Sequence, residues 1–350
     1  MTYPFLTDRT SIETDWTCPR KRWWMLHEGG QGIVPASMPD ALRDGIAVHE
    51  ALASLLSGTP LSLPPMPTEP ETTQKQLEAW ARQVGWLVAF TEWVVPEWIT
   101  PFYDIVAVEQ EMVLERPEIW VAFTADVILR QKAEPKKLVV WDFKSVGWLT
   151  KEWAESWPFA VQVHVNLIGV EEELNEPVSH GLIVGLSKGS EREGKLRHPY
   201  VWAYSDGTQW SSEWKKGWAL RPTWEYGSGG AEGVREWVLS LGREAGLAQF
   251  PLSMPIVADR GLVEELIEAR IQREFDVREA LELVNDDDPE LARSIFSTTF
   301  PQHFKSCRPA VGAGCDYLHA CHNAEIGADP LGSGLFKVRI PHHEIELPND

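Results

Sequence analysis

Apolar and polar positions in roughly the first hundred residues alternate with the period of three to four residues that is typical of amphipathic helices. This pattern predicts helices over residues 12–27, 39–56 and 71–93. The first contains Cys18 followed by Pro19, and the second carries His49 within an apolar stretch. We therefore expect the N-terminal part of the chain to be helical.

The pattern changes after about residue 104, where runs of apolar and β-branched residues replace the helical period. Strands are predicted over residues 105–114, 119–130 and 137–144. Proline-containing breaks at residues 117–118 and 134–137 separate these strands as turns. A meander of three strands is the expected result.

A helix and further strands follow. Pro158 can occupy the first turn of a helix that runs to about residue 170, and this helix places Gln162 and Asn166 on one face. Strands are predicted over residues 181–187 and 200–204, with a hairpin over residues 189–198 between them. Helices are predicted over residues 231–250 and 262–296. This order of strands and helices predicts an α/β fold.

Charged residues close the most apolar of these strands. The run at residues 138–141 ends in Asp142, Phe143 and Lys144, and another carboxylate, Asp126, lies within the preceding strand. Side chains alternate along a strand, so Asp142 and Lys144 share one face and Phe143 points to the other. A salt bridge at a strand end explains this tripeptide when it is taken alone, whereas a divalent cation held by two carboxylates also offsets the cost of burying them.

The composition is that of a globular protein, with 43% hydrophobic and 24% charged residues in 350. The N-terminus lacks the basic and apolar regions of a signal peptide, and no apolar stretch reaches membrane-spanning length, so we expect a cytoplasmic protein without membrane partners. The net charge of −20 excludes a generic nucleic-acid coat. A DNA enzyme would need locally gathered cations, for which the chain offers Arg20, Lys21 and Arg22, Lys136 and Lys137, the set Lys188, Arg192, Lys195 and Arg197, and Lys215 with Lys216.

The four cysteines lie near the two ends of the chain. Cys18 stands alone, whereas Cys307, Cys315 and Cys321 fall within fifteen residues of one another. Four thiolates can hold a [4Fe-4S] cluster or a structural zinc ion, and four unrelated buried cysteines are the other interpretation. Because zinc sites usually contain tight Cys-x2-Cys pairs, which are absent here, the spacing favours iron and sulfur.

Together these residues resemble the RecB-type branch of the PD-(D/E)xK nuclease superfamily. The resemblance rests on His49, Asp126, the tripeptide at residues 142–144 and Gln162, in helix, strand, strand and helix. One cysteine before this core and three after it are similar to the iron–sulfur nucleases of that branch, namely the AddB subunit of bacterial helicase-nucleases, the CRISPR-associated exonucleases and phage-encoded members. Two positions depart from the family pattern: Phe123 replaces a common Gly, and Asn166 replaces the Tyr of a Gln-x3-Tyr motif.

The resemblance implies a restriction-endonuclease-like core with a mixed central sheet flanked by helices, and a helical iron–sulfur subdomain built from both termini. The implied parts are a nuclease core over residues 36–205, an iron–sulfur clasp from residues 1–35 and 300–325, a mainly helical extension over 206–299 packed on the core, and a tail over 326–350. It also implies Mg²⁺ or Mn²⁺ and a structural [4Fe-4S] cluster as cofactors.

The family pattern assigns roles to individual residues. Asp126, Asp142, Lys144 and Gln162 would be catalytic, while His49, Asp126, Asp142 and the backbone carbonyl of Phe143 would hold the metal ion. Outside that pattern, Glu109 on the preceding strand is either an acid that supports these ligands or an ordinary surface residue. The cluster ligands would be Cys18, Cys307, Cys315 and Cys321.

The expected activity is hydrolysis of phosphodiester bonds in single-stranded or end-bearing DNA by a metal-activated water, in the manner of an exonuclease. The expected partners are DNA and the proteins of recombination, repair or CRISPR adaptation. The alternatives are a DNA-binding or assembly subunit that has lost cutting, and a zinc-stabilised scaffold without a nucleic-acid role.

Overall fold

A computed structural model describes most of the chain, namely residues 5–28, 31–37, 40–61, 63–67, 74–146, 151–187, 190–192, 195–197, 202–204, 210–211, 229–284, 289–307 and 314–340. The chain forms two compact units. Unit 1 comprises Met1–Pro39, Glu111–Phe123 and Asp259–Asp350, and unit 2 comprises Asp40–Gln110 and Thr124–Ala258. The boundary at residue 259 falls inside the stretch that the sequence assigns to one helical extension.

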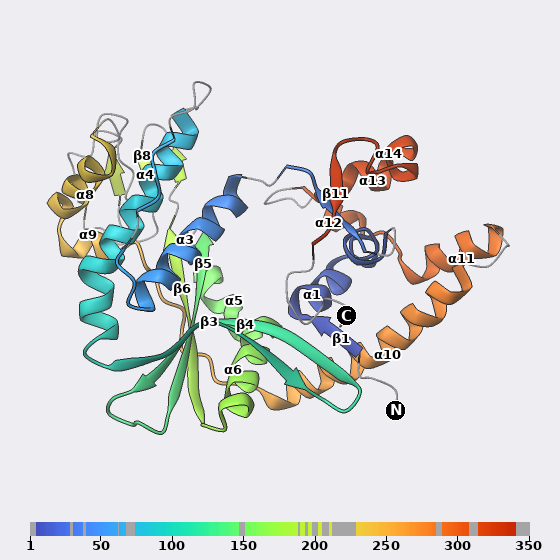
Figure 1. Ribbon diagram of the computed structural model, residues 1–350, viewed down its shortest axis with the longest axis horizontal. Helices are drawn as coiled ribbons and strands as arrows, with labels where there is room; N and C mark the ends of the chain where they lie inside the picture. The colour runs from blue at the N-terminus through green and yellow to red at the C-terminus, as the bar shows by residue number, and fades with distance from the viewer. Residues whose placement is uncertain are drawn as a thin grey trace. The chain divides into compact units, whose positions relative to one another are not determined.

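The main sheet is mixed, which confirms the predicted α/β architecture (Figure 1). It has the order β1-β4-β5-β6, with β3 also paired to β4. β1 runs parallel to β4, β4 is antiparallel to β5, and β5 is parallel to β6. The bounds of these strands are β1 Phe5–Asp8, β3 Tyr103–Glu115, β4 Ile119–Gln131, β5 Leu138–Val146 and β6 Val178–Ser187.

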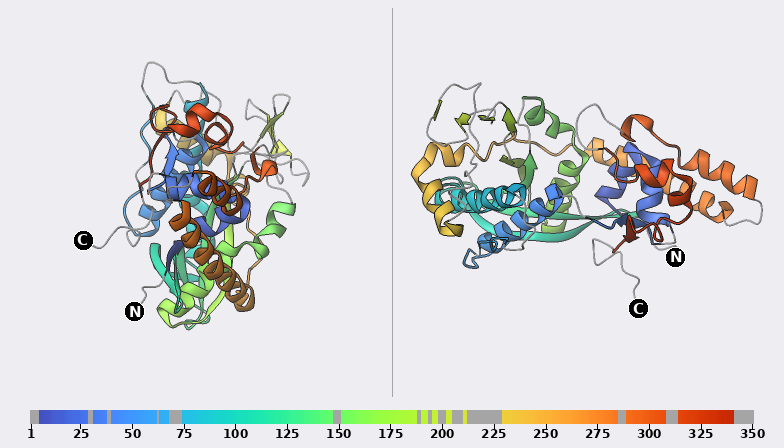
Figure 2. Two further views of the ribbon diagram at one scale, coloured as in Figure 1. Left: turned by 90° about the vertical axis from the view of Figure 1, so that its right-hand side faces the viewer. Right: turned by 90° about the horizontal axis from the view of Figure 1, so that it is seen from above.

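Helices cover both faces of the sheet in unit 2 (Figure 2). Residues 138–143 of β5 are all buried, as expected for a strand that is covered on two sides. Val139, Trp141 and Phe143 join an apolar core with α3 (Asp40–Leu56) and α4 (Gln74–Ala89). The opposite face of β5 and β6 lies against α6 (Val161–Leu174), whose residues 161–170 are all buried.

The helices of unit 2 follow the predicted order with two differences. Pro158 lies in a separate 3-10 turn, Trp157–Phe159, and α6 begins only at Val161 because Ala160 is extended. The predicted helix over 231–250 breaks at Gly242, whose φ of +82° places it in the left-handed region, into α8 (Gly230–Leu241) and α9 (Arg243–Leu247). The remaining elements of this unit are the π-helical segment Phe90–Ile99, α5 (Lys151–Ser156) and a small sheet of β7 (Ser190–Arg192), β8 (Lys195–Arg197), β9 (Trp202–Tyr204) and β10 (Trp210–Ser211).

Unit 1 contains the first helices of the chain and the helices that follow residue 259. The predicted helix over 12–27 is divided at Cys18 into α1 (Arg9–Thr17), α2 (Pro19–Arg22) and the π-helical turn Trp23–His27. The C-terminal part forms α10 (Arg260–Val284), α11 (Pro289–Thr299), α12 (Phe304–Cys307), α13 (Leu318–His322) and α14 (Ala324–Ala328). β11 (Phe336–Val338) pairs with β2 (Ile33–Pro35), so part of the predicted tail is integrated in this unit. Within the described ranges, no helix has the length and hydropathy required to cross a bilayer.

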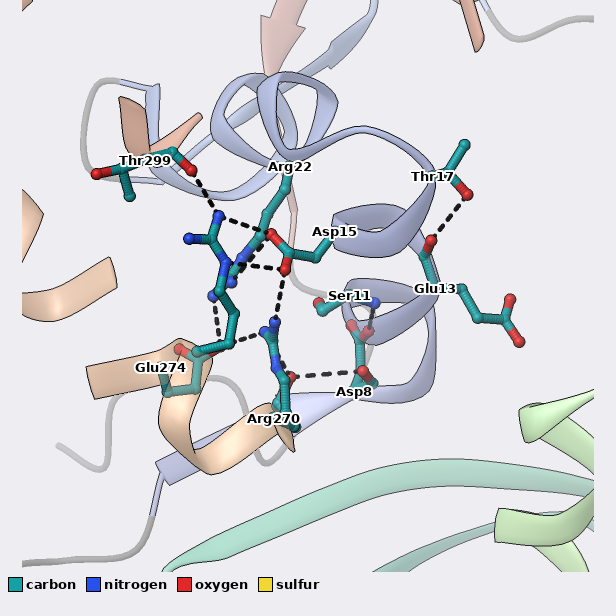
Figure 3. Close-up of polar contacts among 11 residues, drawn as sticks. Asp8, Ser11, Glu13, Asp15, Thr17, Arg22, Arg270, Glu274 and Thr299 are labelled. Carbon is teal, nitrogen blue, oxygen red and sulfur yellow. Dashed lines mark hydrogen bonds and ion pairs between the residues drawn. The ribbon is translucent and has the colours of Figure 1, made fainter. Parts of the chain in front are cut away.

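A buried charge network joins α1, α2 and α10 in unit 1 (Figure 3). Asp15 accepts hydrogen bonds from Arg22 and Arg273, and Arg270 lies 3.7 Å from it. Glu274 pairs with Arg22 and Arg270. Burial alone raises the pKa of Asp15, but the hydrogen bond from Arg273 and the charges of the three arginines outweigh it and lower this pKa.

This network corrects one expectation from the sequence. Arg22 belongs to the cationic run that was expected to be available for DNA, yet its side chain is only 2% exposed and is paired with two acids. Its charge is therefore used inside the fold. Arg20 is also engaged, since its Nε donates a hydrogen bond to the carbonyl of Phe300.

We expect Asp15→Asn to lower the free energy of unfolding by about 3–5 kcal/mol, because it leaves two buried guanidinium groups, those of Arg22 and Arg270, and the half-buried Arg273 with one carboxylate. Urea unfolding measures the change. Glu13→Gln on the same helix is the control, because the Glu13 carboxylate points away from the arginines in Figure 3, and it should cost less than about 0.5 kcal/mol. Equal unfolding midpoints for Asp15→Asn and the wild type would show that the network does not stabilise this unit.

Candidate metal and nuclease site

The two predicted carboxylates lie on neighbouring strands and are both buried. Asp126 on β4 is 7% exposed and Asp142 on β5 is 4% exposed. Strand alternation places Phe143 in the core with α3 and α4, while Asp142 and Lys144 share the other face, and the Lys144 Nζ lies 2.6 Å from Asp142 Oδ2. This confirms the expected orientation of the tripeptide.

Asp126 is held by the backbone of the neighbouring strand. The amide of Phe143 donates a hydrogen bond to Asp126 Oδ2 at 2.7 Å. Burial, followed by the negative charge of Asp142, raises the pKa of Asp126 to about 7. The metal-free site therefore favours a proton on this carboxyl group up to near-neutral pH.

His49 reaches the same place from α3. Its Nδ1 lies 3.6 Å from Asp126 Oδ2, and its ring meets the Phe143 ring edge-on at a centroid distance of 6.1 Å. One turn earlier, α3 passes close to β5 at Gly45, where a Cβ would make an ordinary contact with the Ser145 Oγ at 3.6 Å. Burial alone lowers the pKa of His49, but the carboxylates of Glu109 and Asp126 outweigh it and raise this pKa.

Glu109 on β3 is more central than the sequence indicated. Its Oε1 lies 3.8 Å from His49 Nδ1. Among the described residues, His49, Glu109 and Asp126 form the one group of three metal-ligating side chains whose ligand atoms all lie within 4.8 Å of one another. The backbone of Glu109 has a φ of +47°, in the left-handed region. No periodicity in the sequence could have revealed this geometry.

Gln162 contacts Asp142 from α6, which covers the face of β5 that carries Asp142. Its Nε2 donates to Asp142 Oδ1 at 2.8 Å, so both oxygens of Asp142 have a polar neighbour. Asn166, which replaces the family's Tyr, is 2% exposed and donates to the carbonyl of Thr124 at 3.4 Å. Asn166 therefore packs within the fold. His164, one helical step away, lies 2.8 Å from the Pro158 carbonyl through its Nε2 and so fixes the turn before α6.

The four cysteines all belong to unit 1. Cys18 lies between α1 and α2, and the amide of Cys315 donates to the carbonyl of Cys307 at 2.9 Å. Burial raises the pKa of Cys307, Cys315 and Cys321, and the charge of Cys18 adds to this in each case. The four thiols are therefore electrostatic neighbours.

The surroundings of the thiols include one contact that sequence reasoning missed. Trp24 donates a hydrogen bond from its Nε1 to Cys321 Sγ at 3.1 Å. Trp24 also joins Ile33, Tyr317 and Phe336 in a small apolar core against which Cys315 and Cys321 pack. Its position six residues after Cys18 was the available signal, but tryptophan is frequent in this chain.

We expect the metal-free carboxylate site to contribute less thermal stability as the pH rises from about 5 to about 8, because the raised pKa values of Asp126 and His49 mean that these two groups bind more protons in the folded than in the unfolded state in this range. The lowered pKa of His27 acts in the opposite direction, so the measurement is the difference in melting temperature between the wild type and Asp126→Asn at each pH. Saturating Mn²⁺ should raise the melting temperature of the wild type more at the higher pH, and Asp126→Asn should reduce this effect. A difference that shifts in favour of the wild type from pH 5 to pH 8 without metal would contradict this electrostatic description.

Comparison with known proteins adds no family name to this geometry. A scan of the chain against models of protein families gives no match, and a search of curated proteins finds no relative.

Proposed function

We propose that this chain is a metal-dependent DNA nuclease of the RecB-type PD-(D/E)xK branch. The observation that carries the proposal is the convergence of Asp126, the Asp142–Lys144 pair and His49 from three separate elements of unit 2. A structural salt bridge explains Asp142 and Lys144 by themselves. It does not explain a second buried carboxylate with an imidazole beside it.

The donor set suits a hard divalent cation. Carboxylate oxygens are the ligands that Mg²⁺ and Mn²⁺ prefer, and an imidazole favours Mn²⁺. Asp126, Asp142 and His49 would hold the ion, with the Phe143 carbonyl as a fourth donor. When bound, the ion would lower the pKa of the attacking water and polarise the scissile phosphate.

Lys144 and Gln162 prepare this site for hydrolysis. The Lys144 side chain is 27% exposed, so its ammonium group could contact a phosphate while it remains beside Asp142, and it would stabilise the negative charge that develops on the phosphoryl oxygens. Gln162 fixes the orientation of Asp142 through its hydrogen bond to Oδ1. Lys144 is thus the catalytic cation, and Gln162 positions a carboxylate.

The substrate follows from the resemblance. On that basis we propose exonucleolytic cutting of single-stranded or end-bearing DNA, with partners in recombination, repair or CRISPR adaptation. A cytoplasmic location is proposed from the N-terminal sequence. The net charge of −20 requires that DNA binding depends on local cations. The cationic residues Lys188, Lys215 and Lys216 lie outside the described residues.

We further propose that Cys18, Cys307, Cys315 and Cys321 hold a structural [4Fe-4S] cluster. The donor set is four thiols in one electrostatic neighbourhood, and an indole N–H donates to one of the sulfur atoms. Within the described chain, no three of these sulfur atoms lie within 4.8 Å of one another, which is wider than a single tetrahedral zinc ion requires. The cluster would link α1 and α2 to α12 and α13.

The nuclease assignment predicts that Asp142→Asn and Lys144→Ala each reduce Mn²⁺-dependent hydrolysis of end-labelled DNA by about 100-fold or more, because they remove a ligand and a charge that stabilises the transition state. Linear, circular and single-stranded substrates are compared. Lys132→Ala is the control, because Lys132 is an exposed lysine at the other end of β4. DNA binding without any cutting by the wild type would favour an assembly subunit, and unchanged cutting by both variants would refute the site.

The cluster assignment predicts that the anaerobically purified protein is brown, with absorbance near about 400 nm and about four iron atoms per chain. Cys315→Ala should lose iron and melt at a lower temperature. Stoichiometric zinc in place of iron would support the scaffold interpretation. Full iron content in Cys315→Ala would exclude this cysteine as a ligand.

A further inference from the structure

We infer that Glu109 is a direct ligand of the catalytic metal ion, which it binds together with His49 and Asp126. This assignment rests on the proposed metal site and extends it. The family pattern does not include Glu109, whereas the geometry of this chain places its carboxylate beside His49 and Asp126.

The distances between these groups fit a shared cation better than direct bonding. His49 Nδ1 lies 3.6 Å from Asp126 Oδ2 and 3.8 Å from Glu109 Oε1, and both separations exceed those of good hydrogen bonds. At metal–ligand distances of about 2.0–2.1 Å, octahedral ligand atoms lie about 3 Å apart when adjacent and about 4.2 Å apart when opposite. The observed separations of 3.6 and 3.8 Å are longer than the adjacent distance, so the side chains would have to move closer together to bind one ion as neighbouring ligands.

When its acids are ionised, the site also has more negative than positive charge. Glu109, Asp126 and Asp142 carry three negative charges when ionised, and Lys144 supplies one positive charge. With a neutral imidazole the excess is two negative charges, which one divalent cation neutralises. Asp142 Oδ2 is buried and forms an ion pair with Lys144 Nζ at 2.6 Å, without a well-aligned hydrogen bond in the described part of the chain.

The backbone of β3 brings Glu109 to this position. Of the described non-glycine residues, only Glu109 and Asn175 have positive φ angles. Asn175 ends α6, where left-handed Asn is common. Glu109 lies inside a strand, where this conformation is unfavourable for a side chain with a Cβ. The unusual φ redirects a side chain that regular alternation would place elsewhere.

The competing interpretation is that Glu109 acts only through His49, by orienting its ring. Mn²⁺ binding to the metal-free protein, followed by electron paramagnetic resonance and calorimetry, separates the two roles. A direct ligand predicts that Glu109→Gln weakens Mn²⁺ binding by about tenfold or more, and by a similar factor in a His49→Ala background. An indirect role predicts that the effect disappears in that background, which would overturn the inference.

Two further variants keep the test decisive. Glu115→Gln, at an exposed position of the same strand, should leave Mn²⁺ affinity unchanged. If Glu109→Gln does not fold, Glu109→Gly removes the same carboxylate and adopts the positive φ without strain.

Asp126→Asn separates this inference from the proposed function. Loss of Mn²⁺ binding in Asp126→Asn with full binding in Glu109→Gln and Glu109→Gly would refute the role of Glu109 alone. Full Mn²⁺ binding in all three variants would refute the proposed metal site itself.

Discussion

The carboxylate site depends on one constraint, which is that two acidic side chains, Asp126 and Asp142, are buried in neighbouring strands of a hydrophobic sheet. Like charges at short range in a medium of low polarity are unfavourable unless other groups compensate them. The surrounding contacts do so in part. Lys144 and Gln162 approach Asp142, while the Phe143 amide and His49 approach Asp126.

Apolar packing holds in place the strands that carry these two carboxylates. β5 is covered on both faces, so a shift in its register would move Asp142 and Lys144 into the apolar layer that Phe143 occupies. The ten buried residues at the start of α6 hold Gln162 against the face of β5 that carries Asp142, and the packing of α3 on the apolar core brings in His49. The position of each polar group is thus set by apolar packing nearby.

Much of this could be predicted from the sequence, because it depends on local patterns. Strand alternation predicted the shared face of Asp142 and Lys144, and helical spacing placed Gln162 in the helix that follows. Glu109 was underestimated because a left-handed residue inside a strand leaves no periodic signal. β2 and β11 were missed because each has only three residues, which is too short for a periodic signal, and because they pair across most of the sequence. The burial of Arg22 depends on Asp15 and Glu274, which are distant in sequence from each other.

The two clusters of buried charge differ in a way that distinguishes structure from function. In unit 1, three arginines surround Asp15 and Glu274, so every buried acid has cationic partners within the protein and the cluster needs no further cation. At the carboxylate site, three acids share one lysine, and burial together with the charge of Asp142 raises the pKa of Asp126. Burial of charge alone therefore does not distinguish the two clusters. The acidic excess does, because it persists in the fold only if a cation or a proton completes it.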